Sequence, residues 1–392
     1  MIYLLLLFIF IIPVIIYDFA QIEKGRNSWY YIQLIVLILL AGLRFRVGGD
    51  TLDYIEYFDE YPFLSELKYF DFENEYFNPL WYIYNALIKS IYNDFVLFQI
   101  IQSIIVNTVF FWFFKKYTKY YFTAILIYYL GYYLYFNMEI LREILCVCLF
   151  MVSFQFIEKK KYLHYLFFAI LSYYIHYSSL VMFVIPFVLM LPKIKWKTTL
   201  ISFLVLVVIL SIVDLAPLLI STFSGNEKML IKAVAYTTMD GHTLNGNGLI
   251  AYTLPIILLM YVNKNIDSSE LHTKIEKLLL LYILLIGFSI FIPAMFSRMQ
   301  NYLEPFYIIY IVDTLFSAFN TSTFKEKIRS YIIKFAFAFF VFIIYKSYTV
   351  DCSEYMEGKK TYNIYYPYHS VFNPIVEVDR ETFVEIYKKG DL

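Results

Sequence analysis

Two arginines, a glycine pair and two aspartates lie close together where an apolar run of the sequence ends. They belong to the segment Leu43-Arg44-Phe45-Arg46-Val47-Gly48-Gly49-Asp50-Thr51-Leu52-Asp53-Tyr54. A guanidinium group forms paired hydrogen bonds with phosphate oxygens, and a carboxylate can act as a general base or bind a divalent cation. Because charged side chains are costly at the edge of a membrane, this segment is a candidate site for an anionic substrate.

The composition indicates that this segment sits in a membrane protein. The chain has 392 residues, of which 61% are hydrophobic and 16% charged, whereas a soluble domain is about half apolar and about a quarter charged. Its apolar runs suit helices that cross the hydrocarbon, and they lack the alternating pattern of barrel strands. The formal net charge is zero, so nucleic acid is not an expected partner. We predict an all-α, polytopic integral membrane protein.

About twelve apolar runs predict transmembrane helices. They cover residues 2–17, 29–43, 95–114, 120–136, 138–157, 163–175, 178–191, 198–213, 248–262, 278–296, 302–318 and 331–346. Between the second and third runs lies a long, acidic first outer loop, in which Asn78-Pro79 is predicted to open a short re-entrant or interfacial helix. We predict a membrane domain over residues 1–349 and a tyrosine-rich tail on the outer face over residues 350–392.

Basic loops predict the orientation of these helices. Lysine and arginine cluster in the loops near residues 24–26, 115–119, 159–161, 193–197, 264–277 and 325–329, and such loops face the cytoplasm. The alternate loops then face the outside, which places one set of candidates at the outer membrane edge: Arg44, Arg46, Asp50, Asp53, Arg142, His176 and Arg298. Convergent arginines suit a pyrophosphate leaving group, because negative charge builds on it as the bond breaks.

Each candidate also has a purely structural interpretation. Arg44 and Arg46 could extend from a helix end to lipid headgroups. Arg142 could pair with Glu139 or Glu143 on its own helix. The other candidates could stabilise a local turn, loop or helix end: His176, Arg298 and Asp50.

No nucleotide or metal motif supports a cofactor. The histidines are scattered along the chain, and Cys146, Cys148 and Cys352 form no disulfide framework. Asp50 and Asp53 are three residues apart and could share a divalent cation, but no further ligand supports this. We therefore expect no cofactor.

Taken in order, the motifs resemble the EpsG family of Wzy-like bacterial polysaccharide polymerases. The resemblance rests on the segment at 43–54, on Asn137-Met138-Glu139-Ile140-Leu141-Arg142, on Ile175-His176-Tyr177-Ser178-Ser179-Leu180 and on residues 298–302. The family commonly has glutamine near the position of Glu139 and a small residue after the arginine, where this chain has Glu143. These departures concern the detailed role of that helix.

The resemblance implies a membrane glycosyltransferase that joins undecaprenyl-pyrophosphate-linked repeat units of capsule, exopolysaccharide or O-antigen. The reaction would occur at the outer or periplasmic face of the bacterial cytoplasmic membrane. Four arginines would bind the pyrophosphate, Asp50 or Asp53 would be the catalytic base, and His176 would position phosphate or acceptor. The expected partners are the lipid-linked glycan, membrane lipids, a flippase and a chain-length regulator. A lipid-linked oligosaccharide flippase and a sugar acyltransferase with catalytic His176 are the alternatives.

Overall fold

The structure, a computed structural model, is predominantly helical in the part of the chain that it describes. That part comprises residues 2–73, 75–212, 221, 246–263, 269–289, 292–319, 324–350, 360–382 and 384. Within these ranges no strand is formed, and Ser370 forms isolated bridges with Arg44 and Asn373. The predicted all-α class is confirmed. One of the alternate loops that the basic residues predict to face the outside is 214–247, and it lies almost wholly outside the described residues. Cys352 also lies outside them.

The chain divides into two compact units. The first comprises Met1–Ser179 together with Lys346–Leu392, so the C-terminal tail belongs to the same unit as the N-terminal half. Its helices are α1 (Ile2–Pro13), a π-helix (Val14–Phe19), α2 (Arg26–Gly42), α3 (Gly49–Glu60), a 3₁₀ turn (Leu67–Tyr69), α4 (Pro79–Ile91), α5 (Phe95–Tyr117), α6 (Tyr121–Gly131), α7 (Tyr133–Met138), α8 (Leu141–Glu158), α9 (Tyr162–Tyr173) and 3₁₀ turns at Tyr177–Ser179 and Thr361–Ile364.

The second unit is Leu180–Tyr345. Its helices are α10 (Leu180–Met190), α11 (Trp196–Ile212), α14 (Gly246–Asn263), α15 (Glu270–Phe288), α16 (Pro293–Gln300), α17 (Glu304–Ser317) and most of α18 (Phe324–Thr349).

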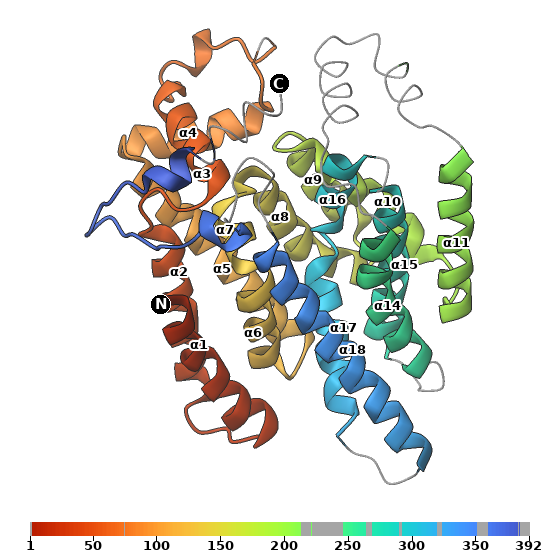
Figure 1. The fold of residues 1–392 in the computed structure, drawn as a ribbon. Coiled ribbons are helices and arrows are strands. Elements are labelled where there is room, and N and C mark those ends of the chain that lie inside the picture. The colour runs from red at the N-terminus through yellow and green to blue at the C-terminus, as the bar shows by residue number, and fades with distance from the viewer. Residues whose placement is uncertain are drawn as a thin grey trace. The chain divides into compact units, whose positions relative to one another are not determined.

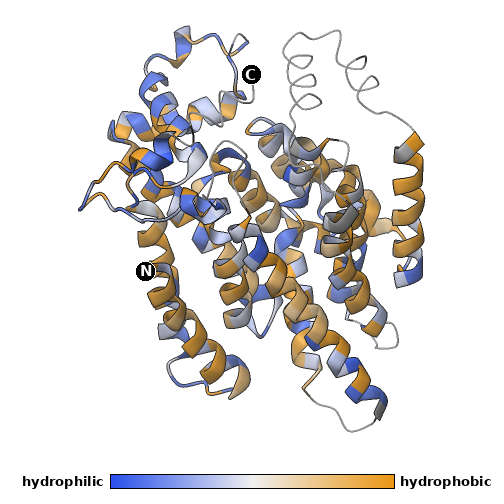
Figure 2. Cartoon of the chain, in the orientation of Figure 1, coloured by the Kyte–Doolittle hydropathy of each residue, from blue (hydrophilic) through white to orange (hydrophobic). Residues whose placement is uncertain are grey.

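Among the described residues, three helical stretches are long and apolar enough to cross a membrane: Ile2–Phe19, Phe95–Tyr117 and Lys325–Thr349. The 23 residues of α5 extend over about 34 Å at about 1.5 Å per residue, against a hydrocarbon core of about 30 Å. Figure 2 shows α1 and α18 hydrophobic along most of their length. Several further apolar helices are shorter, at 10–17 residues. The membrane class is confirmed, whereas the predicted number of spans stays a prediction.

Two predicted runs are interrupted in the structure. The run at 120–136 breaks after Gly131, a residue that weakens helices, and becomes α6 and α7. The run at 278–296 also breaks, because α15 ends at Phe288 and Pro293 starts α16. Proline lacks the amide hydrogen needed inside a helix but fits its first turn. Hydropathy alone does not reveal either interruption.

The basic loops of the first unit lie at one end of its helices. The start of α2 meets the end of α5 and the start of α6, where Lys115 Nζ donates to Asn27 Oδ1 at 3.2 Å and Arg26 Nε donates to Tyr121 Oη at 3.0 Å. The end of α5 meets the end of α8, where Tyr117 Oη donates to Glu158 Oε2 at 2.6 Å. This end carries the lysines of the 115–119 and 159–161 loops.

The segment that follows α2 lies at the opposite end. There the start of α5 contacts it, because Gln99 Nε2 donates to the carbonyl oxygen of Arg44 at 3.1 Å. The start of α8 is also here, where Gln102 Nε2 donates to Leu141 O at 2.7 Å. Helices α5 and α8 run parallel to each other and antiparallel to α2, so the basic loops and the arginine segment lie about one helix length apart (Figure 1).

Candidate functional site

Arg44 is buried between the end of α2 and the start of α3. Only 2% of its surface is exposed. Its Nη1 donates to Ala41 O at 2.5 Å, and its Nη2 donates to Thr51 Oγ1 at 3.1 Å. Burial lowers the pKa of Arg44 to about 10, so the guanidinium stays charged at neutral pH. Arg44 therefore points into the protein and does not extend to lipid headgroups.

The glycine pair allows α3 to dock against the junction of α7 and α8. Gly48 has a φ of 103°, and a Cβ there would lie 2.7 Å from Met138 O. Such a φ favours glycine over other residues. Glu139 accepts hydrogen bonds from the backbone N–H groups of Gly49 and Asp50, both at 2.8 Å. A carboxylate at the start of a helix satisfies amides that have no partner within the helix.

Glu139 therefore organises the candidate site, although it was not among the predicted site residues. The side chain is 8% exposed. Burial and the neighbouring Asp50 carboxylate raise the pKa of Glu139 to about 8, while the two amides and Arg44 act in the opposite direction. The signal in the sequence was the Gly48-Gly49 pair, because adjacent glycines indicate a close approach of another chain segment.

Arg142 lies beside α3, the helix that carries both aspartates. Asp50 is exposed and Asp53 is partly buried, one helical turn apart. Arg142, in the first turn of α8, donates from Nε to Tyr54 Oη at 3.1 Å. Its guanidinium carbon also lies 4.1 Å from the centre of the Phe77 ring, a cation–π distance. Arg142 is therefore beside the helix that carries both candidate bases.

The first predicted outer loop forms a compact aromatic cap. Its centre is the cluster of Tyr54, Phe58, Tyr61, Phe77, Trp81 and Tyr82 from α3, α4 and the loop between them. Trp81 Nε1 donates to Tyr61 Oη at 2.9 Å. The helix predicted to open at Asn78-Pro79 is α4, with Asn78 as its N-cap residue. The cluster fixes α3, and with it Asp50 and Asp53, to the rest of the first unit.

His176 lies in a tight turn after α9. It is 7% exposed, and its Nδ1 lies 2.7 Å from Ser178 Oγ and accepts the Ser178 amide at 3.2 Å. The preceding residues contact the start of α4, because Asn78 Nδ2 donates to Tyr173 O at 2.7 Å. His176 therefore has the geometry of a hydrogen-bonded turn residue, and its predicted role in substrate positioning stays a prediction.

The structure places six of the seven predicted site residues in the first unit. The exception is Arg298, which lies in α16 of the second unit. Among the described residues, no group of three or more His, Cys, Asp or Glu side chains is suited to a metal ion. The expectation of no cofactor stays a prediction.

The C-terminal tail covers the arginine segment (Figure 1). The Phe45 amide donates to His369 O at 2.9 Å, and the Val371 amide donates to Leu43 O at 2.9 Å. Arg46, a predicted pyrophosphate ligand, forms an ion pair with Glu381, with 2.5 Å between Nε and Oε1. Sequence reasoning missed this contribution, because the two partners are more than three hundred residues apart.

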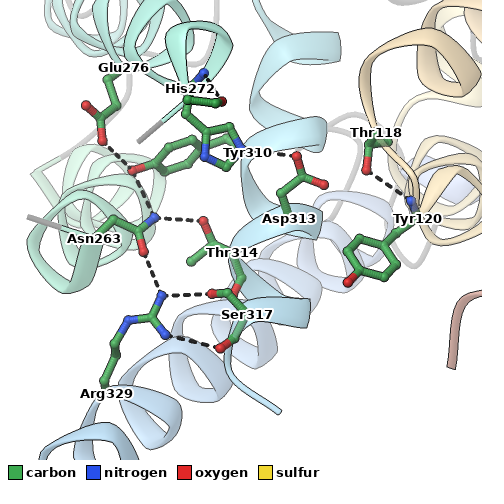
Figure 3. A network of polar contacts seen from close by, with 11 residues as sticks. Thr118, Tyr120, Asn263, His272, Glu276, Tyr310, Asp313, Thr314, Ser317 and Arg329 are labelled. Carbon is green, nitrogen blue, oxygen red and sulfur yellow. Dashed lines mark hydrogen bonds and ion pairs between the residues drawn. The ribbon is translucent and has the colours of Figure 1, made fainter. Parts of the chain in front are cut away.

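A separate polar network joins four helices of the second unit (Figure 3). His272 Nε2 lies 3.0 Å from Asp313 Oδ2, and Tyr310 Oη donates to Glu276 Oε1 at 3.1 Å. Asn263 links Tyr310 to Arg329, whose Nη2 donates to Asn263 Oδ1 at 3.0 Å and to Ser317 Oγ at 2.8 Å. These groups satisfy one another, so the network connects α14, α15, α17 and α18. None of them was a predicted site residue.

The apolar helices and the buried charges define a multi-pass membrane protein. A model of the EpsG family matches residues 27–370, most of the chain. The chain belongs to the EpsG family, a family of Wzy-like polysaccharide polymerases. No curated protein and no solved structure matches it. The family match includes every predicted site residue and ends before Arg380 and Glu381.

Proposed function

We propose that this protein polymerises polyprenyl-pyrophosphate-linked oligosaccharide repeat units into a cell-surface polysaccharide. The reaction takes place at the outer face of the bacterial cytoplasmic membrane. The observation that carries the proposal is the match to the polymerase family over residues 27–370. The contact of Arg142 with α3, the helix of Asp50 and Asp53, supports it. A glycosyl transfer needs a cation for the pyrophosphate and a carboxylate base close to each other.

The proposed step is a glycosyl transfer between two lipid-linked glycans. A hydroxyl oxygen of the incoming unit forms a bond to the anomeric carbon of the growing chain. The bond from that carbon to the pyrophosphate oxygen breaks, and polyprenyl pyrophosphate leaves with the electron pair. Asp50 or Asp53 accepts the hydroxyl proton. Arg46 and Arg142 neutralise the leaving group directly, and the buried charge of Arg44 adds to the positive field. The role of Arg298 as a pyrophosphate ligand stays a prediction.

Two features support a site at the outer face. The arginine segment lies at the end of the first unit opposite its lysine-rich loops, and such loops face the cytoplasm in bacterial membrane proteins. Lipid-linked repeat units also have their pyrophosphate at the membrane surface, at the depth of a helix end. Arg44 and Arg142 each lie at such an end.

Replacing Arg142 tests the proposal in a strain that lacks the chromosomal gene. We expect Arg142→Ala to accumulate single lipid-linked repeats, because the leaving group loses a compensating charge. Arg26→Ala is the control, because Arg26 lies at the opposite end of the same unit. Both proteins must be present in the membrane at the wild-type level.

Polymer of normal length from Arg142→Ala would contradict the proposed site. A deletion strain that accumulates repeats only at the cytoplasmic face would indicate a flippase instead. A polymer that keeps its length and loses acyl groups would indicate an acyltransferase.

A further inference from the structure

We propose that Glu381 occupies the anion-binding position of Arg46, and that Arg380 holds the Arg46 peptide so that this position is formed. The pyrophosphate of a lipid-linked glycan would displace the Glu381 carboxylate from Arg46, an assignment of the anion that rests on the proposed function. The C-terminal tail then determines the affinity of Arg46 for a phosphate-bearing ligand.

The backbone of Arg46 requires outside support. Its φ is 51°, in the left-handed region that residues other than glycine rarely adopt. Arg380 Nη1 donates to Arg46 O at 2.7 Å, and Arg380 Nη2 donates to Pro367 O within the tail. Arg380 is 4% exposed. A buried guanidinium thus fixes the peptide that presents Arg46.

The side chain of Arg46 is held by the next residue of the tail. Glu381 Oε1 lies 2.5 Å from Arg46 Nε, and the two side chains are 27% and 28% exposed. Ion pairs that are partly open to water contribute little to stability. A phosphate group carries more charge than a carboxylate and matches the guanidinium fork with two hydrogen bonds. Phosphate can therefore replace Glu381 at Arg46 without opening the protein core.

The tail keeps these two residues in register with the arginine segment. Besides the hydrogen bonds of Phe45 and Val371, the Gly48 amide donates to Ile364 O at 3.3 Å. Both Arg380 and Glu381 follow the end of the family match at residue 370. The control over Arg46 is therefore supplied by a part of this chain that lies outside the matched region.

The tail also contains a matched control. Glu377 pairs with His369, with 2.6 Å between Oε1 and Nε2, and its side chain has the same 28% exposure as that of Glu381. Glu377→Gln and Glu381→Gln each remove one negative charge from the same segment. Only the second change neutralises the charged partner of Arg46.

The experiment measures binding of inorganic pyrophosphate to the full-length protein in nanodiscs of neutral lipid, by isothermal titration calorimetry. We expect Glu381→Gln to bind pyrophosphate about tenfold more tightly than wild type, because an internal competitor is removed. Glu377→Gln should bind like wild type. Arg46→Gln combined with Glu381→Gln should show no gain. Equal affinity of Glu381→Gln and wild type, including no binding to either, would overturn the proposal, as would an equal gain from Glu377→Gln.

Arg380 is a positioning residue. Its test distinguishes a change in the position of Arg46 from a loss of folding. Arg380→Met should weaken pyrophosphate binding, and Arg380→Lys should recover part of it, because lysine can still donate to Arg46 O. Thermal stability and elution profile identify any variant that misfolds. Wild-type pyrophosphate affinity in a folded Arg380→Met protein would remove Arg380 from the proposal.

The outcome is independent of the polymerase assay. Normal polymer length from Arg142→Ala, with tighter pyrophosphate binding by Glu381→Gln, would contradict the polymerase site alone. Loss of polymer from Arg142→Ala, with unchanged binding by Glu381→Gln, would contradict the tail assignment alone.

Discussion

A single hydroxyl group connects Arg44 to the junction of α7 and α8. Thr51 Oγ1 accepts from Arg44 Nη2 at 3.1 Å and donates to Met138 O at 2.5 Å. Thr51 and Arg44 are both buried, so water cannot replace these bonds. The hydroxyl therefore determines where the buried positive charge lies.

Thr51→Val should destabilise the first unit by about 1–3 kcal/mol, because it leaves a buried donor and acceptor without partners. Thr51→Ser keeps the hydroxyl and should stay near wild type. Thermal unfolding in nanodiscs measures both variants. Equal melting temperatures for Thr51→Val and wild type would show that these bonds contribute no net stability.

Glu139 should make stability depend on pH. Its pKa is raised to about 8 in the folded protein, against about 4.3 for an unperturbed glutamate. A raised pKa of an acid means that the folded state binds the proton more tightly. The contribution of Glu139 is thus complete below the unfolded pKa and is lost as pH rises through about 8.

We expect the melting temperature of wild type, measured relative to Glu139→Gln, to fall between pH 6 and pH 9, a window set by the raised pKa. Glutamine cannot titrate and retains one acceptor for the amides of Gly49 and Asp50. Melting curves over that range measure the difference. A difference that is constant with pH would mean that Glu139 does not titrate there.

For single residues, the sequence was enough to recognise the candidate site residues but not the residues that they contact. The segment around Arg44 and the motif around Arg142 were recognisable from charge beside apolar runs. The contact of Arg142 with Tyr54 depends on the folding of the outer loop. Local spacing contains no information about such a distant pair.

Among the elements, α3 is stabilised at its end by a lysine of α4. Lys89 Nζ donates to the carbonyl oxygens of Phe58, Asp59 and Tyr61 at 3.0, 2.8 and 2.7 Å. The last carbonyl groups of a helix have no partners within it and favour a positive charge. Lys89 thereby connects the ends of the two helices that form the aromatic cap.

Lys89→Met should increase amide hydrogen exchange throughout residues 49–60, because the end of α3 loses its donors. Lys68→Met is the control, since Lys68 is exposed in the same loop and its Nζ lies 4.5 Å from the centre of the Tyr69 ring. Exchange followed by mass spectrometry distinguishes the two. An equal effect from both variants would contradict a specific cap.

The network in Figure 3 connects helix ends in the second unit, as Lys89 does in the first. Arg329 of α18 donates to Val262 O of α14 at 3.2 Å and to Ser317 O of α17 at 3.2 Å. Arg329→Met should lower stability by about 1–3 kcal/mol, because acceptors at two helix ends lose a donor. Lys327→Met, at an exposed position of α18, should not. Thermal unfolding compares them, and similar losses would contradict the role of Arg329.

Helix positions were largely predictable, because apolar runs and proline mark them. α4 begins at Pro79, after Asn78, as the sequence predicted. The interruptions at Gly131 and before Pro293 were not predicted, because hydropathy averages over the whole run. Which helices cross the bilayer is a question of tilt and burial that length alone does not answer.

At the scale of the whole molecule, the C-terminal tail belongs to the unit that carries most of the candidate site. The sequence predicted a tyrosine-rich tail on the outer face. Its backbone pairing with residues 43–48 could not be predicted, because the two segments are joined only in the folded chain. The tail thus connects the end of the chain to the arginine segment near its start.

Polymerisation by the purified protein tests the proposed activity most directly. The protein in nanodiscs would receive a synthetic polyprenyl-pyrophosphate-linked repeat unit and no other protein. We expect a ladder of products, with one polyprenyl pyrophosphate released for each new linkage, and no ladder from Arg142→Ala. Repeat units that stay single with the folded wild-type protein would contradict the proposed activity.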